Sequence, residues 1–340
     1  MGVDTRDSAP EKRAPEPPFF SVILPVWNRQ EVVRRCLDSL LSQDFQPFEV
    51  IAVDDGSTDR SLAVLRACSD PRLVVIAHDV NRGVCAARAT ATAAARGAWH
   101  LTVDSDWTLD AGAMTRLAQL ARTVAPEVGW IGACARSDKG EVWPVNPMPE
   151  GPFGFDEYLR WSDKPGPSDH LSCRRREVAD SVPWPTDRRL EVQMILRIAR
   201  RWRFHVLREP LATIYTDCKN RYQSDDSAQG LARKMDSARD QAVMTEEVLE
   251  EFGADLRQFS PSRYAQVVES AAQYNLQAGR RWQGIRFSIR AMGRRPLSIR
   301  IWTTLFLGLL GPRLIRVVGR AEPARKAYRM LSRLGSHDAE

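Results

Sequence analysis

The sequence predicts an α/β protein in which a mostly parallel sheet carries helices on both faces and a helical extension follows at the C-terminal end. Two observations lead to this fold class. Over residues 18–112, short β-favouring runs alternate with helical segments, and strands joined by helices form parallel sheets that are covered on both sides. Over residues 225–340 the sequence is helical in character and basic.

The first two strand and helix pairs have clear local signals. Residues 21–26, SVILPV, favour β structure and predict the first strand. Apolar residues recur at helical spacing over 29–43, so an amphipathic helix is expected there. Residues 50–53, VIAV, predict the second strand. The turn and N-cap residues at 54–59 then start a helix that continues through Leu62, Leu65 and Ala67.

The same unit then repeats. Residues 73–76, LVVI, predict the third strand, and the alanine-rich segment 82–96 predicts the third helix. The fourth strand, 99–103, runs directly into Asp104 and Asp106. Three crossovers of this kind indicate a parallel sheet.

Polar residues follow each predicted strand at the point where it ends. In parallel sheets, ligands bind outside the carboxyl ends of the strands. The polar residues at these ends are Asn28, Arg29, Asp54, Asp55, Asn81, Arg82, Asp104 and Asp106. Four carboxylates gathered on one edge repel each other unless a cation or hydrogen-bond donors compensate. Ser57, Thr58 and Asp59 are more simply explained as turn and capping residues.

The triplet Asp104-Ser105-Asp106 is the sharpest chemical signal at this edge. Two carboxylates at a strand end can hold one hard divalent cation, and that cation can hold a diphosphate. Acidic triplets are common in solvated loops, so the triplet alone is a weak signal. Its position directly after a predicted strand favours the metal site.

Four segments, taken together, resemble a family 2 glycosyltransferase of the GT-A fold. They are SVILPVWNR at 21–29, VDDGSTD at 53–59, NRG at 81–83 with Arg88, and VDSD at 103–106. The resemblance is strong over about residues 18–112, moderate over 165–224 and general beyond. It implies an enzyme that moves a sugar from a nucleotide-diphospho-sugar to an acceptor hydroxyl.

The resemblance also implies which residues contact the donor. These donor-binding residues are Pro25, Val26, Asn28, Asp54, Asp55, Asn81, Arg82, Arg88, Asp104 and Ser105. Asp106, with Asp104, would hold a Mn²⁺ or Mg²⁺ ion that neutralises charge on the departing diphosphate. Trp107 stands where family members often carry another acidic or amide residue. Because the two aspartates are present, we still expect metal binding.

An inverting transfer needs a general base that deprotonates the acceptor hydroxyl. The resemblance places this base at the start of a helix, commonly as Glu-Asp or Asp-Asp. Glu191 is the candidate base, and Val192 replaces the second acid. The alternative is that Glu191 is an ordinary first-turn glutamate stabilised by the helix dipole. Asp217 is a further, weaker candidate, for contact with the metal or diphosphate.

The organisation of the chain follows from these assignments. A polar, proline-rich tail is expected over 1–17, a catalytic domain over 18–224 and a basic helical region over 225–340. The catalytic domain divides into a nucleotide-binding half, 18–112, and an acceptor half, 113–224. The acceptor half is rich in tryptophan and proline, and its tryptophans either stack on sugar rings or pack loops.

Composition limits the remaining possibilities. The 6 cysteines form no C-x-x-C pair and the 5 histidines form no zinc pattern, which favours a reducing compartment and argues against zinc. No apolar run directs export, so a cytoplasmic location is expected. Between residues 280 and 333 there are 13 arginines and one lysine against one acid, in a chain of net charge +6. No nucleic-acid motif accompanies this charge, so an anionic membrane surface is the preferred partner.

The apolar stretch 299–310 within this basic region is too short and too interrupted by glycine and proline to span a bilayer. An interfacial helix at the inner face of the membrane and a helix packed on the catalytic domain explain it equally well. If the stretch rests on the membrane, the acceptor would be lipid-linked.

We therefore predict a single-addition, metal-dependent, inverting transferase of cell-envelope or other glycan synthesis, since the Gln-x-x-Arg-Trp motif of processive synthases is absent. The alternative is a catalytically silent sensor or scaffold that keeps the nucleotide-sugar pocket. Two departures from the family pattern, Trp107 and Val192, favour this alternative. A nucleotidyltransferase would need a glycine-rich phosphate loop with a lysine near the first strand, and residues 27–29 do not provide one.

Overall fold

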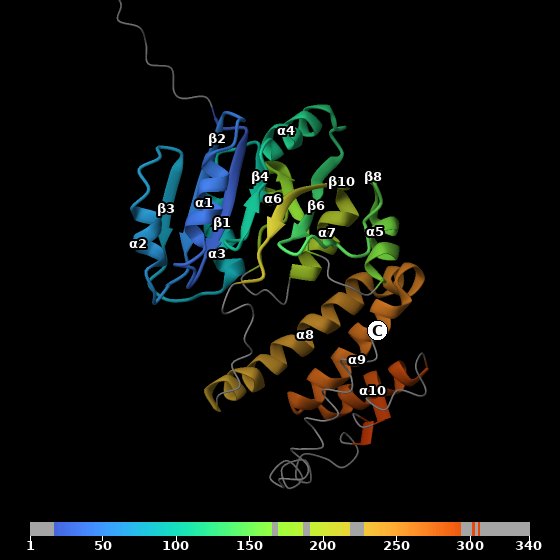
Figure 1. The fold of residues 1–340 in the computed structure, drawn as a ribbon. Helices are drawn as coiled ribbons and strands as arrows, with labels where there is room; N and C mark the ends of the chain where they lie inside the picture. The colour runs from blue at the N-terminus through green and yellow to red at the C-terminus, as the bar shows by residue number, and fades with distance from the viewer. Residues whose placement is uncertain are drawn as a thin grey trace, which may run out of the picture.

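An α/β domain with a bundle of helices below it forms the protein (Figure 1). The computed structural model describes residues 17–164, 169–185, 191–217, 228–293, 301–302 and 305–306, and only the backbone of 228–237. Nearly all of the predicted tail, Cys218 and most of the basic sequence beyond Gly293 lie outside the described residues.

The predicted strands and helices of the first half are confirmed. The strands are β1 (Phe20–Val26), β2 (Phe48–Asp54), β3 (Leu73–Ala77) and β4 (Trp99–Thr102), and they are parallel in the order β3-β2-β1-β4. The helices are α1 (Val33–Leu41), α2 (Ser61–Arg66) and α3 (Val84–Ala94). α1 begins later than predicted because Asn28 takes a positive φ of 51° and the residues after it form a turn. Gly83, with a φ of 93°, delays the start of α3 in the same way.

The second half makes the sheet mixed. Its elements are β5 (Trp107–Leu109), α4 (Ala113–Thr123), β6 (Val128–Ser137), β7 (Val142–Trp143), β8 (Gly151–Phe153), α5 (Phe155–Ser162), β9 (Leu171–Arg175), α6 (Arg176–Ser181), α7 (Glu191–Arg201) and β10 (Arg203–Ile214). β9 lies antiparallel between β4 and β6, and β10 is parallel to β6 but antiparallel to β5. The main path through the sheet is β3-β2-β1-β4-β9-β6-β10-β5.

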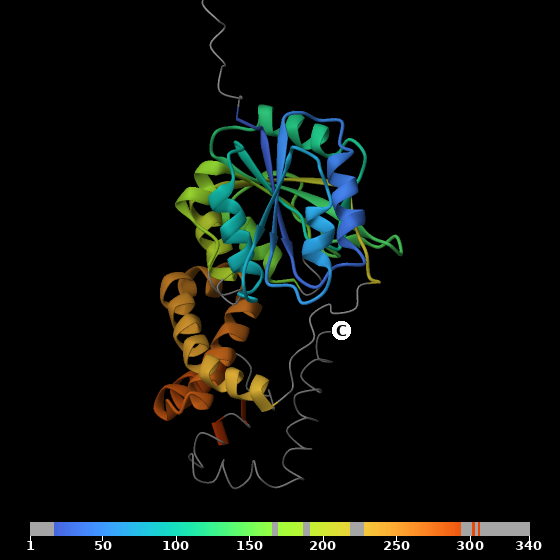
Figure 2. The ribbon, with the colours of Figure 1, turned by 90° about the vertical axis from the view of Figure 1, so that its left-hand side faces the viewer.

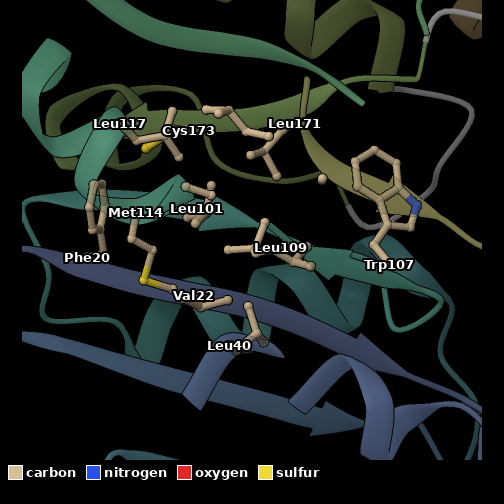
Figure 3. Packing of buried hydrophobic residues seen from close by; sticks show 14 of the residues in the cluster. Phe20, Val22, Leu40, Leu101, Trp107, Leu109, Met114, Leu117, Leu171 and Cys173 are labelled. Carbon is tan, nitrogen blue, oxygen red and sulfur yellow. The ribbon is translucent and has the colours of Figure 1, made fainter. Parts of the chain in front are cut away.

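Helices cover both faces of this sheet, with α1 and α3 on opposite sides (Figure 2). α1 and α4 pack on one face, where Leu40, Met114 and Leu117 meet residues of β1, β4 and β9. Trp107 belongs to this core, as Figure 3 shows. The residue that departs from the family pattern is therefore a buried packing residue.

The helical region consists of α8 (Ala228–Phe259), α9 (Pro261–Gln277) and α10 (Arg281–Met292). It is attached to α5 and α7. Ser260 Oγ and the backbone nitrogen of Arg263 both donate to Asp163 Oδ1 at 2.9 Å, and Arg197 forms an ion pair with Glu251 at 2.8 Å. Within the part of the chain that the structure describes, no helix is long and apolar enough to cross a bilayer.

Candidate active site

The carboxyl ends of β1 and β2 are tied together by a network of turn hydrogen bonds. Asn28 Oδ1 accepts a bond from the backbone nitrogen of Thr58 at 2.8 Å, and the backbone nitrogen of Asn28 donates to Ser57 Oγ at 3.0 Å. The backbone nitrogen of Arg29 donates to Ser61 Oγ at 2.7 Å. Ser57 and Thr58 are thus turn residues, as the turn interpretation predicted. The Asn28 side chain stabilises the same turn through its hydrogen bond with Thr58.

Asp54 and Asp55 do different things despite being neighbours. The Asp55 carboxylate accepts bonds from the backbone nitrogens of Arg82 and Gly83, at 3.0 and 2.7 Å, and contacts His78 Nδ1 at 2.7 Å. It therefore fixes the loop that enters α3. Asp54 is also buried, and its Oδ2 accepts a bond from the backbone nitrogen of Ser57 at 3.0 Å. Its Oδ1 has no hydrogen-bond partner in the part of the chain that the structure describes. A buried, unpaired acceptor is a position where a ligand N–H or O–H group can bind.

The other donor-binding candidates lie around this edge in different environments. Pro25 and Val26 are buried in β1, and the carbonyl of Val26 accepts a bond from the backbone nitrogen of Asp55 at 2.8 Å. Asn81 and Arg82 are exposed, whereas Ser105 is buried beside the triplet aspartates. Only the exposed pair can therefore offer freely accessible side chains to a ligand.

Arg88, on α3, joins the two most important candidates. Its Nη2 lies 2.8 Å from Asp104 Oδ1, and its Nη1 lies 3.1 Å from Glu191 Oε1. We call these three residues the Arg88 cluster. The Arg88 side chain is only 11 % exposed. Burial lowers the pKa of Arg88, but the two carboxylates outweigh burial and raise it above its ordinary value, so the guanidinium stays charged.

Glu191 is the first residue of α7. Its carboxylate is partly buried on the side that faces Arg88, whereas the side chain of Val192 is 41 % exposed. The missing second acid of the family pattern thus corresponds to a position that faces outward. Its absence leaves Glu191 as the carboxylate that α7 contributes to the Arg88 cluster.

Asp104 and Asp106 follow β4, and both are partly exposed. The Cys36 thiol, on α1, lies 3.7 Å from the carbonyl oxygen of Asp104. Burial raises the pKa of this thiol, and the carboxylates of Asp106 and Asp104 raise it further. Among the described residues no group of three or more ligating side chains could hold a metal ion. Two carboxylates nevertheless suit Mg²⁺ or Mn²⁺, because such ions complete their shells with phosphate oxygens and water.

Asp217 is held by other residues. Both Asp217 oxygens lie 3.2 Å from the guanidinium of Arg35, which also stacks on the Tyr215 ring at 3.4 Å. This ion pair fastens the end of β10 to α1. Contact of Asp217 with a metal or a diphosphate stays a prediction beside this ion pair.

The site contains one buried charge that sequence analysis did not assign. The Arg174 side chain, on β9, is almost entirely buried beside Trp184 and Met194. The sequence does show three consecutive arginines at 174–176. Which of the three points inward depends on the register of β9, and a polar strand in the middle of a sheet has no alternating apolar signal to predict it.

The acidic edge of the sheet, the unpaired Asp54 oxygen and the Arg88 cluster lie on an α/β fold whose strand ends are the usual place for a ligand site. The profile of glycosyl transferase family 2 matches residues 21–182. The chain thus carries a family 2 glycosyltransferase domain.

Individual proteins each resemble a part of this chain. The succinoglycan biosynthesis protein ExoO of Rhizobium meliloti is 33% identical over 111 residues, which is 33% of this chain and 32% of ExoO. An N-acetylglucosaminyltransferase of Azorhizobium caulinodans is 33% identical over 135 residues, which is 38% of this chain and 34% of that protein. The chain spans about a third of the length of the curated relatives it matches.

Solved structures agree on the fold. Residues 1–349 of TarS from S. aureus superpose with a TM-score of 0.56 at 18% sequence identity, covering 84% of this chain and 90% of that chain. The same protein in complex with UDP-GlcNAc gives a TM-score of 0.55 at 18% identity, covering 84% of this chain and 83% of that chain.

Proposed function

We propose that the protein transfers a sugar from a nucleotide-diphospho-sugar to an acceptor hydroxyl, with inversion at the anomeric carbon and with the help of Mn²⁺ or Mg²⁺. The observation that carries this proposal is the Arg88 cluster. One guanidinium binds both Asp104, next to the diphosphate site, and Glu191, the candidate base. A direct displacement requires the group that binds the leaving diphosphate and the base that activates the acceptor to lie close together.

In this proposal each acidic residue has its own task. The free oxygen of Asp54 accepts a hydrogen bond from the nucleoside, and Asp55 holds the α3 loop beside it. Asp104 and Asp106 would hold the cation, which when bound neutralises charge on the diphosphate leaving group. Glu191 accepts the proton of the acceptor hydroxyl as the oxygen attacks the anomeric carbon. Attack from the side opposite the diphosphate gives inversion.

The biological setting is proposed from the relatives. ExoO is named for succinoglycan biosynthesis and the Azorhizobium relative for N-acetylglucosaminyl transfer. We therefore propose a role in cell-envelope or other glycan synthesis. UDP-N-acetylglucosamine is the first donor to test, because TarS, a protein of the same fold, was solved with it.

The test is a panel of UDP-, GDP- and dTDP-sugars, each with and without Mn²⁺. Donor binding is measured by calorimetry, and release of nucleoside diphosphate is measured with glycan and lipid-linked acceptors. We expect one nucleotide class to bind in a Mn²⁺-dependent way and to be consumed. Binding without turnover for every acceptor, with Glu191→Gln binding the donor like the wild type, would favour the sensor alternative.

We further propose that the catalytic domain spans 18–224 and that the helical region beyond it meets an anionic membrane on the cytoplasmic side. α10 places Trp282, Arg286 and Ile289 on one exposed face, where Trp282 is 74 % exposed. The described residues Trp302 and Phe306 are also exposed. Aromatic side chains beside arginines suit the interface between headgroups and acyl chains. A lipid-linked acceptor would then be presented at the same surface.

A further inference from the structure

Arg174 is a buried cation with few partners. Its side chain is 1 % exposed, and its single hydrogen bond runs from Nη1 to Met194 Sδ at 3.6 Å. Among the described residues, Nε and Nη2 have no hydrogen-bond partner. Burial, together with the neighbouring charge of Arg88, lowers the pKa of Arg174 to about 9. A buried charge in this state destabilises a fold, so its presence calls for a reason other than stability.

The surroundings of Arg174 supply that reason. The guanidinium carbon of Arg174 lies 4.2 Å from the centre of the Trp184 ring, and that of Arg88 lies 4.8 Å from the same ring. One indole thus contacts both cations. Arg88 in turn holds Asp104 and Glu191. Arg174 is therefore one side chain removed from the groups proposed to bind the diphosphate and to take the acceptor proton.

We propose that Arg174 is a positioning residue for sugar transfer: together with Trp184 it holds Arg88 against Asp104 and Glu191, at a cost in stability. The Trp184 ring packs against the Arg88 guanidinium and limits its movement. The like charge of Arg174 opposes any movement of Arg88 toward it, because two cations repel across a site of low dielectric. This inference rests on the proposed function, since it assigns a role within that reaction.

Arg175, the next residue on β9, provides a matched control. Successive side chains of a strand point to opposite faces, so Arg175 lies on the other side of the sheet. It also stacks on a tryptophan, with its guanidinium carbon 4.6 Å from the Trp99 ring centre. Its Nε donates to the backbone carbonyl of Val128 at 2.8 Å. Arg175 therefore resembles Arg174 in residue type and in its aromatic partner, but it is hydrogen-bonded and remote from the Arg88 cluster.

The experiment compares Arg174→Met, Arg174→Lys and Arg175→Met with the wild type. Melting temperature, donor binding with Mn²⁺, and kcat are measured on the full chain. We expect Arg174→Met to melt at the same or a higher temperature and to bind donor within about twofold of the wild type. Its kcat should fall about ten- to a hundredfold, because reacting groups that are displaced from their productive geometry react more slowly. Arg174→Lys should recover part of kcat, because it restores the charge without the planar face.

Trp184→Leu is a second, independent variant, which removes the shared contact while leaving Arg174 in place. It should lose kcat to a similar degree. Arg175→Met should lower the melting temperature and leave kcat unchanged. Wild-type kcat in Arg174→Met and in Trp184→Leu, or losses that merely follow lower melting temperatures, would overturn the positioning role. A wild type that turns over no donor would instead overturn the proposed function itself, and the role of Arg174 with it.

Discussion

Arg88 Nη1 lies 3.1 Å from Glu191 Oε1, although 103 positions separate the two residues in the sequence. The same guanidinium binds Asp104 at 2.8 Å. Without the Arg88 guanidinium, the negative charges of Asp104 and Glu191 would repel each other with no cation between them. The contact therefore links the two residues proposed to serve the donor and the acceptor.

Replacing Arg88 by Met should weaken both functions of the cluster. We expect turnover to fall about a hundredfold or more, and the free energy of unfolding to fall by about 2 kcal/mol, because two carboxylates lose a largely buried partner. Denaturant unfolding and steady-state kinetics measure the two effects. Arg116→Met is the control, since Arg116 forms an exposed pair with Glu209 at 2.9 Å, which should contribute less than about 1 kcal/mol. Equal effects from the two variants would contradict the role given to Arg88.

Glu191→Gln tests the base directly. The amide keeps the size of the side chain but cannot accept a proton at neutral pH, so kcat should fall about 10²- to 10⁴-fold. Donor affinity should stay close to that of the wild type. Val192→Asp, which restores the family's second acid on the outward-facing side of α7, should change kcat far less. A large gain in kcat from Val192→Asp would instead place the base at position 192.

Asp106→Asn tests the metal site. The substitution removes one of two candidate carboxylate ligands, so the Mn²⁺-dependent part of donor binding should weaken by about tenfold or more. The protein should melt close to the wild-type temperature because Asp106 is partly exposed. Calorimetric titration with donor, with and without Mn²⁺, measures the effect. Asp79→Asn, an exposed aspartate after β3, is the control and should bind donor like the wild type. An unchanged Mn²⁺ requirement in Asp106→Asn would rule out this ligand set.

His100 should make the fold sensitive to acid. Burial, with help from Arg174 and Arg176, lowers the pKa of His100 from 6.5 to about 4. Between these pH values the unfolded chain binds a proton that the folded protein does not. Stability should therefore fall as pH drops from 6.5 to 4, by at most about 3 kcal/mol. His100→Asn should flatten this slope in urea unfolding measured over the same pH range. Identical slopes would mean that His100 does not contribute.

The first four strands could be predicted because each has a local signal, an apolar run that ends in a turn or in charged residues. The Arg88 cluster could not. It depends on β9 entering the sheet between β4 and β6, and on α7 then placing Glu191 beside α3. These are long-range placements that periodicity does not encode.

Trp107 is a second feature whose role could not be predicted from the sequence. The family pattern marks the position as a departure from an acidic or amide residue, which suggests a weakened site. In the structure the indole is buried in the core between the sheet and its helices, where burial of a large aromatic stabilises the fold. What a substitution does to a site thus depends on the direction of the side chain, which the pattern alone does not reveal.

The exposed face of α10 should bind anionic membranes. Trp282 and Ile289 lie seven residues apart and Arg286 lies between them, so the three share one side of the helix. Vesicles with phosphatidylserine should sediment the full chain at low salt, and 0.5 M salt should release most of it, because headgroup attraction is screened. Trp282→Ala with Ile289→Ala should weaken binding about tenfold, whereas the matched pair Val243→Ala with Val142→Ala, exposed elsewhere, should not. Equal binding to neutral vesicles, or no binding by the wild type, would contradict the proposed membrane surface.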